Sequence, residues 1–103
     1  MIEVNFESFI QAIVKTCGKH LILSKIITPQ SDIGVTYNRG SISHIWVHGV
    51  TSLGVEHRVA YEQDYRTKVW QLNHYMWKNG KGWTFIGTIK SDILSHIKLA
   101  NLK

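Results

Sequence analysis

Apolar side chains at the start of the chain recur with the period of an α-helix. At 100° per residue they fall within an arc of roughly 100°. They are Ile2, Phe6, Phe9, Ile10, Ile13 and Cys17. Gly18 follows where a glycine commonly ends a helix, because glycine adopts the left-handed backbone of that position easily. The pattern predicts an amphipathic helix that ends at Cys17.

Short apolar runs bounded by turn residues follow this helix and are typical of β-strands. The run at 20–28, rich in Leu and Ile, predicts a strand that ends in a turn at 29–32. The runs at 33–37 and 42–48 flank an Asn-Arg-Gly connection, whose glycine permits a tight turn, so they predict a hairpin. After a loop, residues 55–62 predict a further strand.

Residues 65–78 are compatible with two structures. A helix would carry one apolar stripe, made of Tyr61, Tyr65, Val69, Leu72 and Met76. A strand would turn at 79–80 into a partner at 82–89, and Asn-Gly is the strongest short hairpin signal. If Lys78 opposes Lys81, alternation sorts the side chains into a mostly apolar face and a polar and aromatic face, which favours the strand. The first face holds Trp70, Leu72, His74, Met76, Trp83, Phe85 and Ile89, and the second holds Gln71, Asn73, Tyr75, Trp77, Thr84, Ile86 and Thr88.

The end of the chain predicts a second helix. Asp92 lies in its first turn, and its apolar stripe consists of Ile93, Leu94, Ile97 and Ala100. Together these elements predict a single α+β domain over residues 1–103, in which an antiparallel sheet of about five to six strands is flanked by an N-terminal and a C-terminal helix. Two helices cover only one face of such a sheet, so the other face meets water, a second copy of the chain or a ligand.

The positive charge of the chain is concentrated in its last third. The 103 residues carry a formal net charge of +5. Residues 1–65 contribute −1, whereas residues 66–103 contribute +6 from seven basic side chains and one acid. Such asymmetry indicates an anionic partner, most often nucleic acid, although a solvated surface explains it equally well.

Cysteine usage and the apolar runs bear on the compartment. The one cysteine, Cys17, excludes an intrachain disulfide, which small secreted domains usually contain. The first residues lack a basic start and a long apolar run, so they are a poor signal peptide. No apolar run approaches the roughly 20 residues that span a bilayer. These features predict a cytoplasmic protein with no membrane partner.

The polar and aromatic face of the predicted hairpin is the leading candidate for binding. Exposed rings beside lysines on an open sheet can stack unpaired bases while the cations hold phosphates. The candidate binding residues are Tyr75, Trp77, Lys78, Lys81, Gln71 and Asn73, together with His74 from the other face. The same rings could instead form the interface of a homodimer or bind another protein, because aromatic residues are enriched there too.

His74 supports a second hypothesis, a pocket for a small molecule or an enzymatic site. It lies among apolar residues, so burial would lower its pKa and leave a neutral polar group in an apolar setting. A core histidine hydrogen-bonded to backbone is the simpler interpretation. Glu62 and Asp64 share a strand face and could act as acid and base, or they could be solvated acids at a strand end.

The remaining reactive side chains predict no special chemistry. On a strand, the rings of His44 and His48 project about 13 Å apart, which is too far for one zinc ion without other ligands. Cys17 lies in the apolar stripe at the C-terminal end of a helix, which predicts a buried, inert thiol. The sequence contains no phosphate-binding loop, dinucleotide fingerprint or nucleophile motif, and we expect neither a metal nor a cofactor.

Residues 75–86 read YMWKNGKGWTFI and resemble the closing hairpin of nuclear-transport-factor-like domains, which end in an aromatic strand, a glycine turn and a Gly-Trp strand. The likeness covers about a tenth of the chain. That family places several helices before its sheet, whereas this chain predicts one. No residue roles are therefore transferred from the family.

Taken together, the residues predict a small non-enzymatic binding domain. Its basic, aromatic sheet face would bind single-stranded nucleic acid or a protein partner, including a second copy of the chain. A small-molecule or enzymatic domain with a pocket around His74 is one alternative. A protein-interaction module of the inhibitor or immunity type is the other.

Overall fold

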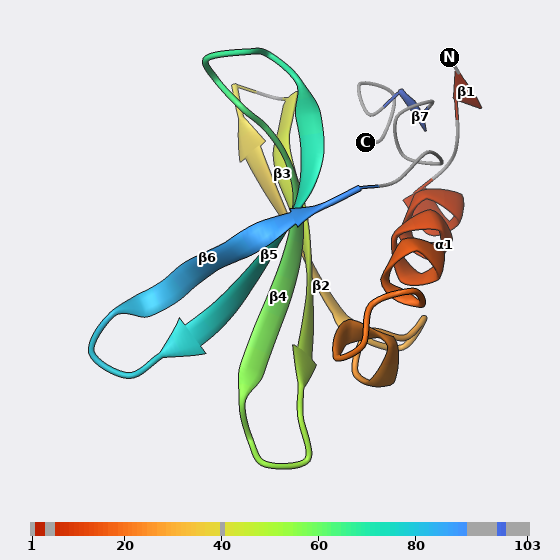
Figure 1. Ribbon diagram of the computed structural model, residues 1–103. Helices are drawn as coiled ribbons and strands as arrows, with labels where there is room; N and C mark the ends of the chain where they lie inside the picture. The colour runs from red at the N-terminus through yellow and green to blue at the C-terminus, as the bar shows by residue number, and fades with distance from the viewer. Residues whose placement is uncertain (1, 4–5, 40, 91–96, 99–103) are drawn as a thin grey trace.

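The computed structural model describes residues 2–3, 6–39, 41–90 and 97–98 (Figure 1). The chain begins with strand β1 (Ile2–Glu3), helix α1 (Phe6–Cys17) and the 3-10 helix η1 (Leu23–Lys25). The sheet strands are β2 (Asp32–Asn38), β3 (Ser41–Val50), β4 (Glu56–Gln63), β5 (Trp70–Lys78) and β6 (Gly82–Ile89), and the short strand β7 (Ile97–Lys98) follows them.

Helix α1 forms as its apolar period predicts. Phe9 and Ile13 are fully buried on one side of it. The amide of Gly18 closes the last turn by donating to the carbonyl four residues earlier, at 3.0 Å. The predicted helical start at residue 2 is wrong, because Ile2–Glu3 pairs as a parallel strand with Ile97–Lys98.

The predicted strand at 20–28 is also wrong, and this segment forms turns around η1. The His20 ring caps these turns, since its Nδ1 accepts hydrogen bonds from the amides of Ile22 and Leu23, each at 3.2 Å. Leu23 and Ile27 are buried four residues apart, which is a helical spacing, while the two residues before Leu23 are exposed. An apolar run without alternation does not distinguish strand from helix, and here a polar ring at its start determines a turn.

The five-stranded sheet is an antiparallel meander in the order β2-β3-β4-β5-β6. The strands predicted at 33–37, 42–48 and 55–62 are all present, with ends shifted by one or two residues. The hairpin between the first two is confirmed, because Asn38 pairs with Ser41 across a short turn in which Arg39 has a positive φ of 53°. The segment before the Asn-Gly turn is a strand, as alternation predicts, and not a helix.

The turn between β5 and β6 is one residue longer than predicted. Lys78 pairs with Gly82 rather than with Lys81, whose amide instead donates to the Lys78 carbonyl at 3.0 Å. Gly80 and Gly82 take positive φ angles of 81° and 79°, which favour glycine at both positions. The pairing of the two strands is therefore shifted by one residue from the predicted register.

This shift changes which aromatic residues share a face. Tyr75 pairs with Phe85 and Trp77 with Trp83, so all four lie on the same side of the sheet. The predicted placement of Trp83 and Phe85 on the apolar side is wrong. Ile86 is the extra residue of a bulge, beyond which the last residues of β6 return to their predicted faces.

The core lies between α1 and one face of the sheet (Figure 1). It consists of Phe9, Ile10, Ile13 and Cys17 from α1, Leu23 and Ile27 from the following turns, and Ile45, Val47, Val59, Tyr61 and Leu72 from the sheet. Phe9 meets the ring of Tyr61 edge-on, with centroids 5.1 Å apart. Among the described residues, the helical elements therefore cover one face of the sheet.

The predicted C-terminal helix falls on residues 91–103. The structure describes only Ile97–Lys98 of these, and this pair forms β7 and not a helix. Ile93, Leu94 and Ala100 of the predicted stripe lie outside the described residues. In the described part, the fold is α+β with one α-helix and a five-stranded antiparallel sheet, rather than a sheet flanked by two helices.

Candidate functional site

The face of the sheet turned away from α1 carries a set of aromatic and polar side chains, which we call the open face. Strand alternation and register place its members there. They are Trp46, His48, Arg58, Glu62, Gln71, Asn73, Tyr75, Trp77, Trp83 and Phe85. Four of the residues predicted to bind, those at alternate positions of β5 from Gln71 to Trp77, are therefore neighbours on one surface.

The centre of the open face is a cation held between two indole rings. The guanidinium carbon of Arg58 lies 4.0 Å from the ring centroid of Trp46 on β3 and 4.4 Å from that of Trp83 on β6. Such contacts contribute about 0.5–2 kcal/mol each. The buried Nε of Arg58 has no hydrogen-bond partner among the described residues, so the rings hold this side chain. Trp46 in turn lies against Gly34, where an added Cβ would come within 1.9 Å of its ring.

Two edge-on ring pairs join β5 and β6 beside this stack. Trp77 meets Trp83 edge-on with centroids 5.5 Å apart, and Tyr75 meets Phe85 in the same way at 5.8 Å. Edge-to-face contacts leave ring faces available for other partners. Trp77 is 42% exposed and Phe85 is 54% exposed. These two rings present apolar surface to solvent.

A carboxylate on β4 organises the other end of the open face. Glu62 Oε2 accepts a hydrogen bond from the side-chain amide of Asn73 at 2.6 Å and another from the Tyr75 hydroxyl. Asn73 also accepts from the Thr88 hydroxyl at 2.8 Å, so the chain of bonds crosses β4, β5 and β6. Burial, followed by the bond to Glu62, raises the pKa of Tyr75 to about 12, and its hydroxyl therefore stays a donor near neutral pH. The Glu62 side chain is fixed by this network.

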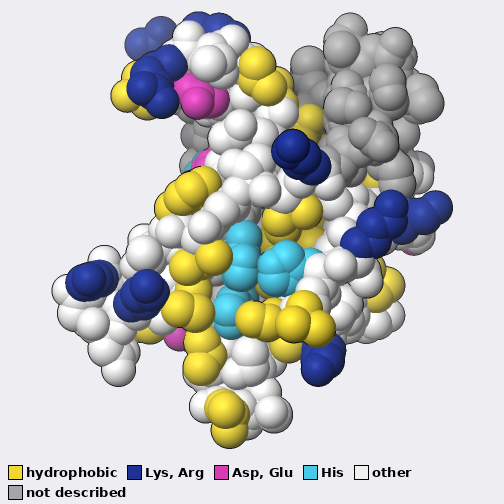
Figure 2. All heavy atoms as spheres, viewed as in Figure 1, with side chains coloured by type: hydrophobic (Ala, Val, Ile, Leu, Met, Phe, Trp, Pro, Cys, Tyr) yellow, Lys and Arg dark blue, Asp and Glu magenta, His cyan; other side chains and the backbone are white. Residues whose placement is uncertain are grey.

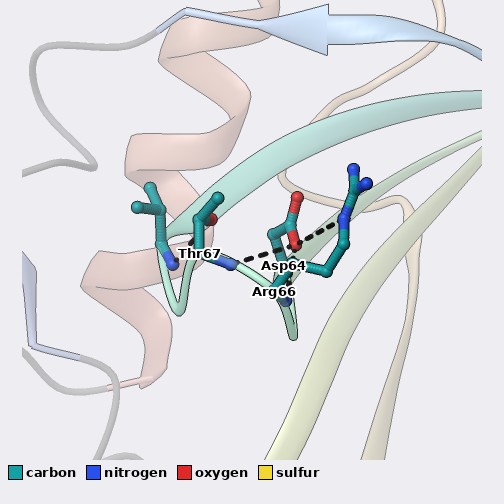
Figure 3. Close-up of polar contacts among 4 residues, drawn as sticks. Asp64, Arg66 and Thr67 are labelled. Atoms are coloured by element: carbon teal, nitrogen blue, oxygen red, sulfur yellow. Dashed lines mark hydrogen bonds and ion pairs between the residues drawn. The ribbon is translucent and has the colours of Figure 1, made fainter.

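Glu62, Asn73 and Tyr75 line a hollow of about 380 Å³ at the end of β4. The rest of its lining consists of Gln63, Asp64, Tyr65, Arg66 and Gln71. Asp64 lies one residue beyond the end of β4, and its carboxylate is engaged by the turn that follows. Its Oδ1 accepts hydrogen bonds from the amides of Arg66 at 2.8 Å and Thr67 at 3.4 Å, and so holds the turn after β4 (Figure 3). The bond from the Arg66 amide is the main cause that lowers the pKa of Asp64. The structure therefore gives this carboxylate a role in the turn.

His74 lies on the opposite face, in a cluster of three histidines beside the core. Its Nε2 lies 2.8 Å from Nδ1 of His57, and its ring meets that of His20 edge-on with centroids 5.2 Å apart. Figure 2 shows histidine side chains gathered in one place with hydrophobic side chains around them. Burial lowers the pKa of His74 to about 4 and also lowers that of His57, and neighbouring histidines add to both shifts. His74 is thus bonded to another histidine and stands apart from the predicted binding surface.

Lys78 and Lys81 are exposed at the tip of the β5–β6 hairpin. By alternation Lys78 belongs to the side of Met76, which is the helix side, and Lys81 lies within the turn. The two lysines therefore adjoin the aromatic end of the open face without forming part of it. In the sequence, Lys78 directly follows Trp77, whose ring is exposed, and Lys81 comes three residues after Lys78.

The open face has six members that the sequence does not predict to bind, and three of these are Trp46, Arg58 and Glu62. Alternation within the strands at 42–48 and 55–62 places all three on the side away from the buried apolar positions. Alternation gives no strand order, however. Only the meander, in which β4 lies between β3 and β5, brings these side chains beside Tyr75.

The other reactive side chains have structural partners. His44 Nε2 lies 3.2 Å from the Thr36 hydroxyl. His48 Nε2 lies 3.2 Å from a carboxylate oxygen of Glu56, a distance that suits an ion pair although the angles do not suit a hydrogen bond. Burial raises the pKa of Cys17 to about 12, so it is a thiol and not a thiolate. Within the described part of the chain, no group of three or more His, Cys, Asp or Glu side chains is arranged to hold a metal ion.

Comparison with known proteins does not assign the chain to a family. No family model, no curated protein and no solved structure matches it. The resemblance to nuclear-transport-factor-like domains stays confined to the hairpin, since α1 is the one α-helix before the sheet in the described residues. No helix in that part of the chain is long and apolar enough to cross a membrane. Functional inference therefore depends on the geometry of the open face.

Proposed function

We propose that this protein binds single-stranded nucleic acid on its open face, as a binding domain and not as an enzyme. The observation that supports the proposal is the pair of exposed rings of Trp77 and Phe85 beside a guanidinium held by two indole rings, on a sheet face that α1 leaves uncovered. Surfaces of this kind stack unpaired bases and hold the phosphates between them.

Unpaired bases offer flat faces that suit Trp77 and Phe85. Each stack of a base on an aromatic ring contributes about 1–3 kcal/mol and tolerates any base. Paired bases in a duplex hide these faces, so a single strand should bind better than a double strand. The sandwich of Arg58 between Trp46 and Trp83 is already formed, which reduces the entropy that binding would otherwise cost.

We expect the exposed cations near both ends of β5 to contact phosphates, with Lys78 reaching the strand from the helix side of the hairpin tip. Lys78 and Lys81 are exposed at its C-terminal end. Arg66, in the turn before its N-terminal end, has a side chain that is 78% exposed. A backbone that crosses the open face along β5 would pass from one group to the other. We place this activity in the cytoplasm, where RNA single strands occur and a lone cysteine stays reduced.

Binding is tested by the fluorescence anisotropy of a labelled, short uridine oligonucleotide titrated with the full chain. We expect binding at low salt that weakens as salt rises, because phosphate contacts release counterions. Three such contacts give a slope of about −2 in a plot of log affinity against log salt for a single strand. A duplex of the same length should bind more weakly. An anisotropy that does not change at low salt overturns the proposal.

Two variants with matched controls separate stacking from charge. Trp77→Ala removes an exposed ring and should weaken binding about 5- to 150-fold. Leu53→Ala removes a side chain that is 90% exposed in the β3–β4 loop and should leave binding unchanged. Lys81→Gln should reduce the salt slope by about 0.7, whereas Lys15→Gln on the exposed side of α1 should not alter it. Equal effects of a variant and its control would contradict the assigned surface.

A second copy of the chain is the other occupant that this face could accept, because aromatic surfaces are common in homodimers. Analytical ultracentrifugation over a range of concentrations distinguishes the two. The proposal expects a monomer in the absence of nucleic acid. A dimer that Trp77→Ala converts to a monomer would identify the open face as a homodimer interface and refute nucleic-acid binding there.

A further inference from the structure

We infer that the hollow at the end of β4 binds a guanine base of the single strand, and that Glu62 reads the Watson–Crick edge of this base. This preference rests on the proposed function, because it presupposes that the open face binds single strands at all. The starting observation is a fixed carboxylate on a surface that should otherwise attract phosphates. A negative charge there repels the backbone, so it is suited to hydrogen-bond donors on a base.

Oε2 of Glu62 is held by two hydrogen bonds, and we assign Oε1 to the hollow that Glu62 lines. Asn73 and Tyr75 both donate to Oε2, and two donors satisfy the two lone pairs of that oxygen. No hydrogen bond to Oε1 is present among the described residues, and Glu62 lines the hollow. Since Oε2 is fixed by bonds from β5, the position of Oε1 is set before a ligand arrives. Such preorganisation is what selective recognition requires.

The donors that suit this oxygen are those of guanine. On its Watson–Crick edge, N1–H and the exocyclic N2–H₂ lie side by side and point the same way, so both can reach one acceptor oxygen. Adenine and cytosine each present one exocyclic amine on that edge, and uracil presents one ring N–H. A carboxylate oxygen with two open lone pairs therefore forms more hydrogen bonds with guanine than with the other bases.

The surroundings of Glu62 match the rest of a guanine nucleotide. Gln71 is its direct cross-strand partner on β5 and lines the same hollow, so its amide can donate to O6. Tyr65 at the rim is 80% exposed and offers a ring for stacking. The Nε of Arg66 lies 4.0 Å from Oδ1 of Asp64. Figure 3 shows the terminal nitrogens of Arg66 directed away from that carboxylate. Those nitrogens are free to contact a phosphate.

The preference is measured with short uridine oligonucleotides that differ only at a central base. Guanine, hypoxanthine, adenine, cytosine and uracil are compared by anisotropy with the full chain at constant salt. We expect guanine to bind about 5- to 150-fold more tightly than adenine, cytosine or uracil. Hypoxanthine lacks the exocyclic amine of guanine, so its affinity should lie between that of guanine and those of the other three bases. Equal affinity for guanine and cytosine would overturn the inference, as would equal affinity for guanine and hypoxanthine.

Glu62→Gln gives a sharper test, because it should reverse the preference. Asn73 and Tyr75 both donate to the side chain, so the glutamine oxygen takes the place of Oε2 and its amide nitrogen takes the place of Oε1. A donor then faces the hollow, which disfavours guanine and favours the carbonyl oxygens of uracil and cytosine. Glu56→Gln on the same strand removes the same charge beside His48 and should keep the preference for guanine. A Glu62→Gln variant that still prefers guanine would refute the assignment.

A second variant covers the case in which Glu62→Gln fails to fold. Gln71→Ala removes the amide assigned to O6 and should reduce the ratio of guanine to adenine affinity, with the affinity of the same variant for the all-uridine strand as the reference. An unchanged ratio counts against the site. Binding of the all-uridine strand without any base preference would reject the guanine hollow and leave the proposed function standing. Absence of binding by every strand would reject both.

Discussion

The paired histidines on the helix side make the fold sensitive to acid, and His74→Phe should remove most of that sensitivity. Nδ1 of His57 and Nε2 of His74 lie 2.8 Å apart, so a single proton lies between the two nitrogens. The side chains are only 3% and 4% exposed, and His20 contacts the second ring. A further proton therefore brings charge into a confined space beside the core.

The size of the pH effect on stability follows from the difference between the pKa of His74 in the folded chain and in the unfolded chain. Its pKa is lowered from 6.5 to about 4, chiefly by burial and then by His57 and His20. Each pKa unit corresponds to about 1.36 kcal/mol, so the two states differ by roughly 3 kcal/mol. Between pH 6.5 and about 4 the unfolded chain binds more protons than the folded chain, and the free energy of unfolding falls as the pH drops. That loss is a large part of the roughly 5–15 kcal/mol that stabilises a typical domain.

Urea unfolding followed by tryptophan fluorescence, repeated from neutral pH to about pH 4, measures this dependence. His74→Phe should lose roughly 3 kcal/mol of the decline, although it leaves His57 without a partner and should lower stability at neutral pH by about 1 kcal/mol. His44→Gln, on the other face beside Thr36, should keep the wild-type decline. A wild-type curve that stays flat over this range, or a His74→Phe curve as steep as the wild type, would refute the reasoning.

Two substitutions and one labelling experiment test the packing around the core and the open face. Gly34→Ala should lower the free energy of unfolding by about 1–3 kcal/mol, because the added carbon would lie 1.9 Å from the Trp46 ring. Gly87→Ala is the matched control in the same urea experiment, because its added carbon would have nothing within 4 Å. Cys17 should react with an aromatic disulfide reagent only as the chain unfolds, and rapid reaction of the native protein would contradict its burial. Arg58→Met should lower stability by about 1–2 kcal/mol and change the near-ultraviolet circular dichroism of the tryptophans; an unchanged spectrum would show that the indole sandwich does not persist in solution.

The strands were predictable because alternation is a local property. Asn73 and Tyr75 reach the open face, and Leu72 reaches the core, in any strand that contains this segment. The segment at 20–28 was not predictable in the same way. Its structure depends on hydrogen bonds from the backbone to the His20 ring, and such bonds leave no trace in the apolar pattern.

The candidate site was predictable only in part. Gln71 and Trp77 were grouped correctly because they alternate along one strand. Arg58 and Trp46 come from other strands, and their contact is visible only once the strand order is known. His74 was expected to be buried, and it is, but its partner is His57, seventeen residues earlier in the chain. Contacts between side chains of different strands depend on strand order and register, and neither composition nor hydrophobic period predicts these.

The extra residue in β6 determines the character of the open face. Strand alternation without a bulge would force Trp83 and Ile89 to the same side of the sheet, because they are six residues apart. The core needs Ile89 on the helix side, where it packs against the buried cluster. Ile86 interrupts the alternation, so Ile89 stays on that side while Trp83 and Phe85 face the other way. The bulge and the longer glycine turn therefore serve the open face, where Trp83 closes the sandwich around Arg58.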